Sequence, residues 1–491
     1  MSADANRVTI LGLSRFGLGA RPGELQNFSS DIRGALLNDV SLEAVAVPAG
    51  ENVLPSAEAF HRFRVERDEI KAARQAEAEK KPAPSTDMAA AANPEEKAAP
   101  AVALDAGQKP NPQPDPAKLP KRQVPRELFQ AETTARMEAA LKAKTGFAER
   151  LVLFWSNHFC VSARKSGELR VLAGPFEREA IRPHIFGRFA DMLLAVEKHP
   201  AMLAYLDNEQ SIGPNSQGGQ RAKKGLNENL AREIMELHTL GVGGGYSQED
   251  VTALARILTG WRFARKDNAL SDEGRFLFNV NLHEPGEHKL LGRTYDDNGL
   301  AQGEAALLTL AYHSATAHHI ATKLAVHFVS DAPDPALVAK LEKTFHETGG
   351  DLAAVSRALI EAPEAWREEQ TKLRTPYEFL AAALRATGVA LKPPQINGSL
   401  ASMGQPLWSP PGPNGFPDLA SAWISPEGMK ARLDVASQIG SLVTGDAKPA
   451  DVLLGVLGTS VSEETKTAVA RAESGAQGFA LLLMSPEFQR R

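Results

Sequence analysis

The chain has 491 residues, of which 43% are hydrophobic, and a formal net charge of -5 at pH 7. This length exceeds what one hydrophobic core usually supports, so we expect one large domain or two coupled domains. The apolar content excludes a disordered chain, and the mild charge offers neither a basic footprint for nucleic acid nor a polybasic membrane patch. No run approaches the roughly 18 to 20 apolar residues of a membrane-spanning helix.

The single cysteine, Cys160, excludes an intramolecular disulfide bond and a zinc site made of several cysteines. Arg7, Ser14 and Arg15 interrupt the apolar character of the first 20 residues, so no signal peptide is expected. Neither feature decides the compartment, and the protein could be cytoplasmic or exported together with a partner.

The composition changes sharply over residues 66–122, where Ala, Lys, Glu and Pro predominate and large apolar residues are few. Residues 66–81 could form a solvated, charged helix, whereas the proline-rich residues 82–120 offer too little apolar surface to fold. We therefore expect 66–122 to be a disordered insertion in a surface loop. It would separate an N-terminal helical part of the core (1–65) from the main helical domain (123–491), the two forming one unit.

Helical periodicity dominates the chain after this insertion. The clearest helix is 246–260, because Ser247 and Asp250 have the spacing of a capping box and an apolar stripe follows them. Pro183 predicts a break near the start of a helix over 176–199. The pattern predicts further helices over 127–146, 147–159, 315–329, 335–347, 352–361 and 376–387.

Residues 275–291 are the one segment with the pattern of extended chain. Apolar side chains alternate over 276–280, and Pro285 with Gly286 predicts a turn before 288–291. We expect one small β-hairpin here. Because strands and helices do not alternate elsewhere, the fold class is predicted to be mainly α, a large multi-helix domain with a minor β-hairpin.

The most informative segment is 227–241. Wound as a regular α-helix, it places Glu233 in the middle of a stripe of leucine and isoleucine side chains, with Asn229 and Glu236 at the edge of that stripe. Burying an unpaired carboxylate is costly, so Glu233 must be paired, metal-bound or protonated. This position therefore has either a structural or a catalytic explanation.

The structural explanation is an ion pair with an arginine of the 176–199 helix, since a guanidinium can bind both carboxylate oxygens. The candidates for that partner are Arg178, Arg182 and Arg188. The catalytic explanation is a raised pKa, as in general acids. In that case Glu233, Glu236 and His283 are the candidate catalytic residues.

Other polar side chains interrupt apolar or turn-rich stretches, and they could bind a substrate if they met in one pocket. Trp155 and Phe159 are expected to be buried anchors, with two polar side chains between them that face a polar interior. No spacing typical of metal ligands occurs, so no metal site is predicted, and no cofactor is identified. The candidate substrate-binding residues are Asn157, His158, Asp207, Asn208, Asn229 and Lys289.

Several long motifs are similar to those of one family. They are LSRFGLGARPGE from Leu13, FWSNHF from Phe154, IRPHIFGRFADMLLAVEKHPAMLAYLDN from Ile181, NENLAREIMELHTLGVGGGYSQEDVTALARILTGW from Asn227, HEPGEHKLLG from His283 and GQPLWSPPGPNGFPD from Gly404. On these motifs the chain resembles the family called domain of unknown function 1800 (DUF1800), over nearly its whole length outside the insertion.

The resemblance implies a large, helical bacterial protein without an established activity. Genes of the family often neighbour those of a sulfatase-like family, DUF1501, whose members commonly carry export signals. Two functions stay open: a hydrolase-type enzyme that uses carboxylates on an envelope or extracellular polymer, or a non-catalytic binding or export-partner protein that acts with a DUF1501 protein. Convergence of the polar side chains on one pocket would favour the enzyme.

Overall fold

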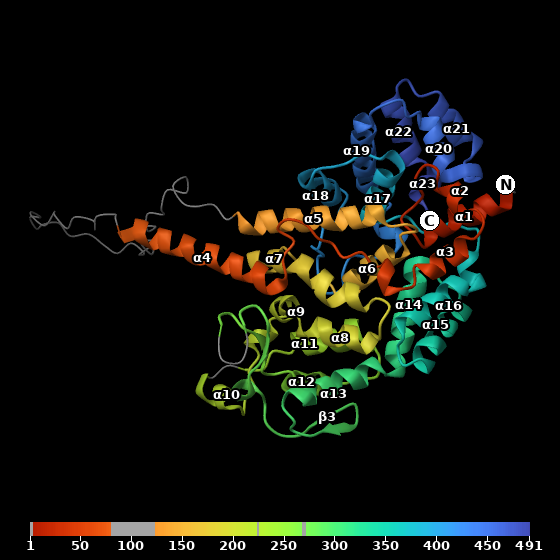
Figure 1. Cartoon of the computed structure of the whole chain (residues 1–491). Coiled ribbons are helices and arrows are strands. Elements are labelled where there is room, and N and C mark those ends of the chain that lie inside the picture. The colour runs from red at the N-terminus through yellow and green to blue at the C-terminus, as the bar shows by residue number, and fades with distance from the viewer. Residues whose placement is uncertain (1–2, 80–122, 223–224, 268–271) are drawn as a thin grey trace, which may run out of the picture.

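The computed structural model describes residues 3–79, 123–222, 225–267 and 272–491 (Figure 1). Within these ranges the chain is largely helical, with two small antiparallel sheets of two strands each. This confirms the predicted mainly α fold class. The disorder expected for 82–120 lies outside the described residues. None of the described helices combines the length and the apolar character that crossing a membrane requires.

The N-terminal helices lead into a helical pair that projects from the body of the molecule (Figure 1). The helix α4 continues through residues 66–79, which the composition assigned to the insertion. It does so because Ile70 is buried and because the Glu66 carboxylate accepts hydrogen bonds from the backbone of Gln123 and Val124, at 2.6 and 2.9 Å. These helices are α1 (Ala3–Arg15), α2 (Glu24–Phe28), α3 (Ile32–Asn38), α4 (Ser56–Glu79) and α5 (Val124–Lys142).

The central helices are interrupted where prolines remove backbone donors. The single helix expected over 176–199 is wrong: a π-helix follows Pro175 and a 3₁₀ turn contains Pro183, so the break predicted at Pro183 is confirmed. The elements here are α6 (Phe147–His158), α7 (Gly167–Phe176), the π-helix Glu177–Ile181, the 3₁₀ turn Arg182–His184, α8 (Phe189–Lys198) and α9 (Pro200–Tyr205).

A lower lobe in the view of Figure 1 contains both small sheets. The predicted α12 is confirmed, with Ser247 and Asp250 forming the expected capping box. The elements of this lobe are α10 (Gln217–Ala222), α11 (Asn229–Glu233), the π-helix Ile234–His238, α12 (Gln248–Ile257), β1 (Trp261–Phe263), β2 (Phe276–Phe278), β3 (His288–Leu290), β4 (Arg293–Tyr295) and α13 (Leu300–Ala311).

The strands do not pair as the sequence predicted. The expected hairpin between 276–280 and 288–291 is wrong, because β2 pairs with β1 and β3 pairs with β4. Leu291 and Gly292 both have positive φ, at 49° and 78°, which is the backbone of the tight turns that close two-residue hairpins. The turn that closes a hairpin therefore lies at Leu291, not at Pro285.

The remaining helices form a three-helix layer beside α6 and a C-terminal bundle (Figure 1). In the first turn of α17, Thr375 and Glu378 form a second capping box, with Pro376 at the first helical position. The helices are α14 (Ser314–Phe328), α15 (Pro335–Glu347), α16 (Leu352–Glu361), α17 (Pro376–Thr387), α18 (Pro393–Ser402), α19 (Pro426–Leu442), α20 (Pro449–Leu457), α21 (Glu463–Ala470), α22 (Gly475–Met484) and α23 (Pro486–Gln489).

Aromatic side chains from α6 and α8 lie in the middle of the core. Trp155 and Phe159 are 1% and 0% exposed, which confirms their predicted burial. Their rings stack with centroids 5.9 Å apart, and Phe189 of α8 contacts both. Helix α6 is therefore fixed by its aromatic face, and this determines where its polar side chains point.

Candidate functional site

The segment that carries Glu233 is not one regular α-helix. Helix α11 ends at Glu233, and the π-helix Ile234–His238 follows directly. The wider π turn shifts the side chains after it relative to a 100° spacing. As a result Leu237 is only half-buried, whereas His238 is fully buried. The regular stripe predicted over 227–241 is therefore wrong in its second half.

Glu233 itself is half-buried, and within the described chain no hydrogen bond or ion pair engages its carboxylate. The expected pairing with an arginine of 176–199 is wrong, because all three candidates are held elsewhere. Their partners are Glu132 for Arg178, Glu149 and Glu177 for Arg182, and the carbonyl oxygens of Thr348 and Gly349 for Arg188.

The surroundings of Glu233 favour its protonated form. Burial raises the pKa of Glu233 above its ordinary value, against the attraction of nearby His238. The neighbouring carboxylate of Glu236 adds to the increase and is itself 3.5 Å from the Arg232 guanidinium. Burial and then Glu233 also act in the same direction on Tyr205, whose pKa is raised. Two carboxyl groups three residues apart thus lie in different electrostatic environments.

The next candidates are Asn229, Asp207 and Asn208. Asn229 is exposed at the first residue of α11. Asp207 forms an ion pair with Lys165 at 2.7 Å. Asn208 is buried, and its amide donates to the carbonyl oxygen of Trp261 at 3.0 Å, which connects the end of α9 to β1. Asn208 is therefore part of the packing, whereas Asp207 and Asn229 remain at the surface.

His283 and Lys289 are separated from Glu233 by α12, which packs against α11 and against β3. His283 is buried, and its Nδ1 bonds the carbonyl oxygen of Thr259 at 3.0 Å. Lys289 is exposed on β3. The structure therefore does not bring these two side chains to the carboxyl pair of Glu233 and Glu236.

Asn157 and His158 point away from each other at the end of α6. The Asn157 side chain accepts from the backbone N–H of Phe416 at 2.8 Å and donates to the carbonyl oxygen of the same residue at 2.9 Å. His158 is 2% exposed, and its Nε2 bonds the carbonyl oxygen of His238 at 3.1 Å. Both side chains thus lie in a polar interior, as predicted, on opposite sides of α6.

A cavity of about 70 Å³ lies beside Asn157, between α6, the start of α17 and the 405–418 loop. This volume can hold several water molecules or one small polar molecule. Tyr377, 4% exposed, lines the cavity, and burial raises its pKa to about 12. The polar lining side chains are Arg136, Ser156, Asn157, Cys160, His327, Thr375, Tyr377, Glu378, Gln405 and Asp418.

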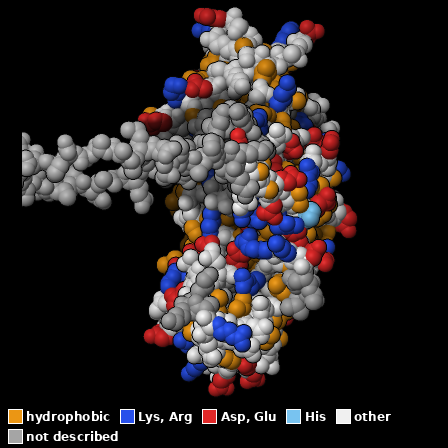
Figure 2. All heavy atoms as spheres, turned by 90° about the vertical axis from the view of Figure 1, so that its left-hand side faces the viewer, with side chains coloured by type: hydrophobic (Ala, Val, Ile, Leu, Met, Phe, Trp, Pro, Cys, Tyr) orange, Lys and Arg blue, Asp and Glu red, His pale blue; other side chains and the backbone are white. Residues whose placement is uncertain are grey.

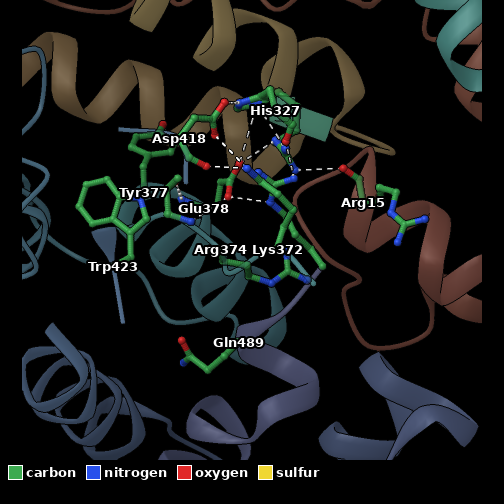
Figure 3. A network of polar contacts seen from close by, with 12 residues as sticks. Arg15, His327, Lys372, Arg374, Tyr377, Glu378, Asp418, Trp423 and Gln489 are labelled. Atoms are coloured by element: carbon green, nitrogen blue, oxygen red, sulfur yellow. Dashed lines mark hydrogen bonds and ion pairs between the residues drawn. The ribbon is translucent and has the colours of Figure 1, made fainter. Parts of the chain in front are cut away.

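A network of buried charges forms one wall of this cavity (Figure 3). Glu378 is at its centre, with ion pairs of 3.0 Å to the Nε atoms of Arg150 and Arg491. Burial by itself would raise the pKa of Glu378, but the two guanidinium groups lower it to about 2. The carboxylate is therefore ionised and serves to hold α6, α17 and the last residues together.

His327 and Asp418 form a second pair in this network. The His327 Nδ1 is 2.9 Å from Asp418 Oδ2, and Arg150 Nη2 is 3.3 Å from His327 Nε2. An arginine can only donate, so Nε2 accepts and the proton resides on Nδ1, facing the carboxylate. Burial lowers the pKa of His327, so the imidazole is neutral. Lys372, whose ammonium is 2.8 Å from Asp331 and 3.6 Å from Asp418, completes the group.

The sequence analysis missed every member of this network. Glu378 could have been found, because Thr375 and Glu378 have capping-box spacing. Arg150 could have been noticed as a cation inside the apolar segment 147–159. Asp418 and Arg491 carry no local signal, since their partners are distant in the chain.

Acidic and basic side chains are interspersed over the face that lies on the left of Figure 1, as Figure 2 shows. Among the described residues, no group of three or more His, Cys, Asp and Glu side chains is arranged to hold a metal ion.

Comparison with known proteins gives one match. The family described as Protein of unknown function (DUF1800) matches residues 12–490. No curated protein and no solved structure matches the chain.

Proposed function

The chain belongs to the DUF1800 family, and from its own geometry we propose that it is an acid–base enzyme of hydrolase type. Glu233 is its general acid, and Glu236 is the companion carboxylate. His283, which was also a candidate from the sequence, has no part in this proposal, because α12 separates it from the pair.

The observation that carries the proposal is the unpaired state of Glu233. The four other carboxylates whose burial is deepest in the ion-pair networks, among them Glu378, are neutralised by arginine. Glu233 has a raised pKa, no cation in contact within the described chain, and a side chain that solvent still reaches. A group that retains its proton near neutral pH and is accessible is suited to protonating a leaving group.

Glu236 differs in the way that the second carboxylate of such a pair requires. Its ion pair with Arg232 favours the charged form, which can activate a water molecule. The π-helix places both side chains near one surface, and π turns are frequent at functional sites. Because Glu233 and Glu236 lie at the half-buried surface of the lower lobe, an extended substrate suits them. We propose an envelope or extracellular polymer, with Asn229 and Asp207 as flanking polar contacts.

The test compares the wild-type protein with Glu233→Gln on purified envelope polysaccharide and peptidoglycan and on 4-nitrophenyl esters and glycosides. Wild-type protein should hydrolyse at least one of these, and Glu233→Gln should lose about 100-fold or more of that rate. Glu249→Gln, at an exposed position of α12, is the matched control and should keep the rate. The melting temperature of Glu233→Gln should stay constant or rise, because the amide avoids the cost of burying a charge.

Equal rates for Glu233→Gln and wild type would refute the role of Glu233. Loss of stability in Glu233→Gln would indicate a structural carboxylate instead. The rate should also fall as pH rises through the raised pKa of Glu233, since the acid form is then lost.

A second function is favoured by Val242, which is 83% exposed in the glycine-rich turn that follows the π-helix. An isolated apolar side chain at a loop tip can anchor a protein partner. In this alternative the protein binds a sulfatase-like DUF1501 protein without catalysis. Val242→Asp should then abolish copurification of the two proteins, whereas Glu233→Gln should not. Copurification that survives Val242→Asp would refute this surface.

A further inference from the structure

One face of α14 carries three basic side chains that the proposed function does not use. His319, Lys323 and His327 are spaced four residues apart, so they follow one another along the same face of the helix. The rings of His319 and His158 are 6.0 Å apart, and the ring of His327 lies 5.4 Å from that of Phe154. This face is therefore turned toward α6, with Lys323 in the middle of the contact.

Lys323 is an unusual lysine. Within the described part of the chain its ammonium makes no hydrogen bond and no ion pair, yet the side chain is at most half-exposed. Cys160 and Asp418 act on it electrostatically, and both line the 70 Å³ cavity. The amine therefore borders that cavity, one helical turn from His327, which also lines it.

Two imidazoles beside Lys323 have lone pairs that no partner takes up. The His158 Nε2 bonds a backbone carbonyl, while its Nδ1 is buried without a partner in the described structure. The His319 Nε2 bonds the carbonyl oxygen of Leu237 at 3.2 Å, which leaves Nδ1 as the acceptor. The cluster thus combines a nucleophile with two bases next to an internal space.

We propose that Lys323 is a nucleophilic amine that forms an imine with a small aldehyde or ketone entering the cavity beside Cys160. The amine nitrogen attacks the carbonyl carbon, and His158 or His319 takes the proton that the nitrogen loses. The carbonyl oxygen receives protons and leaves as water, so that a C=N bond replaces the C=O bond without any change in oxidation state. This site is independent of Glu233 and goes beyond the proposed hydrolase.

The charge states of the cluster agree with this chemistry. Burial lowers the pKa of Lys323, so the neutral, nucleophilic amine is favoured. Burial also lowers the pKa of His319 to about 4 and that of His158 well below its ordinary value, so both imidazoles are available as bases. Asp418 opposes the effect on Lys323, but its carboxylate is already bound by His327 and Lys372. Burial raises the pKa of Cys160 to about 12, which leaves the thiol unreactive.

The experiment traps the imine in the intact protein. Full-length protein is incubated at pH 7 with glycolaldehyde or pyruvate and sodium cyanoborohydride, and peptide mass mapping follows the adducts over time. Lys340, exposed on α15, is the internal reference. Lys323 should be modified about tenfold faster than Lys340, because only the neutral amine attacks. Modification at the same rate as Lys340 or more slowly would overturn the proposal.

Two further measurements separate a cavity amine from a merely exposed one. Pyridoxal, which is too bulky for the cavity, should modify Lys340 but not Lys323, and equal labelling of both would contradict the cavity site. Lys323→Met should keep the wild-type melting temperature and lose the fast adduct, whereas Lys340→Met should keep it. If Lys323→Met unfolds, the trapping rates in the wild-type protein still decide the question. A rate that Glu233→Gln leaves unchanged would show that this site does not depend on the proposed hydrolase.

Discussion

Replacing Glu378 by Gln tests whether the buried network holds the fold together. The side chain is 1% exposed and is the shared partner of Arg150 and Arg491. Gln keeps the shape and the cap of α17 but leaves two buried guanidinium groups without their counter-charge. Breaking a buried pair in this way costs about 3 to 5 kcal/mol of unfolding free energy.

The pKa of Glu378 leads to a similar magnitude. It falls from an ordinary value of 4.5 to about 2 in the folded protein, and each unit is worth about 1.4 kcal/mol, so the ionised form contributes on the order of 3 kcal/mol. Because the folded-state pKa is depressed, this contribution is complete above pH 4.5. It is lost as the pH falls toward 2.

Denaturant unfolding monitored by tryptophan fluorescence measures the effect. Glu378→Gln should be less stable than wild type by about 3 kcal/mol at pH 7, and the difference should shrink as the pH falls below 4.5. Glu473→Gln, at an exposed position before α22, should match the wild type throughout. A Glu378→Gln protein with the wild-type midpoint at pH 7 would refute the network as a source of stability.

Two further predictions concern α6 and its neighbour α14. Trp155→Ala should lower the unfolding free energy by about 3 to 5 kcal/mol, because it leaves a cavity in the aromatic core; an unchanged denaturant midpoint would contradict this. Burial lowers the pKa of His319 to about 4, so between pH 6.5 and 4 the unfolded chain binds a proton that the folded protein does not, and stability falls as the pH decreases. His319→Gln should show a shallower loss over that interval in pH-dependent melting, and an identical slope would count against a neutral folded imidazole.

Local chemistry in the sequence was enough to predict most of the helices. The Ser247 capping box and the apolar stripe after it place α12 correctly, because a cap and its partner lie three residues apart. The break at Pro183 follows from a missing backbone donor in the same way. The burial of Trp155 and Phe159 also followed from their position in an aromatic run.

Pairings between distant segments could not be predicted in this way. The strand β2 pairs with β1 rather than with the segment after Pro285, because the partner is chosen by packing and not by the nearest turn signal. The arginines expected near Glu233 are taken by carboxylates of α5 and α6.

The candidate site divides along the same line. The sequence by itself determined that Glu233 is an anomalous carboxylate, since its apolar neighbours are adjacent in the chain. Only the tertiary structure decided that it is unpaired, that His283 lies beyond α12, and that Lys323 faces the cavity beside Cys160. The physical reason is that hydrogen bonding within a helix is local, whereas burial, ion pairing and pKa depend on which distant segments pack around a side chain.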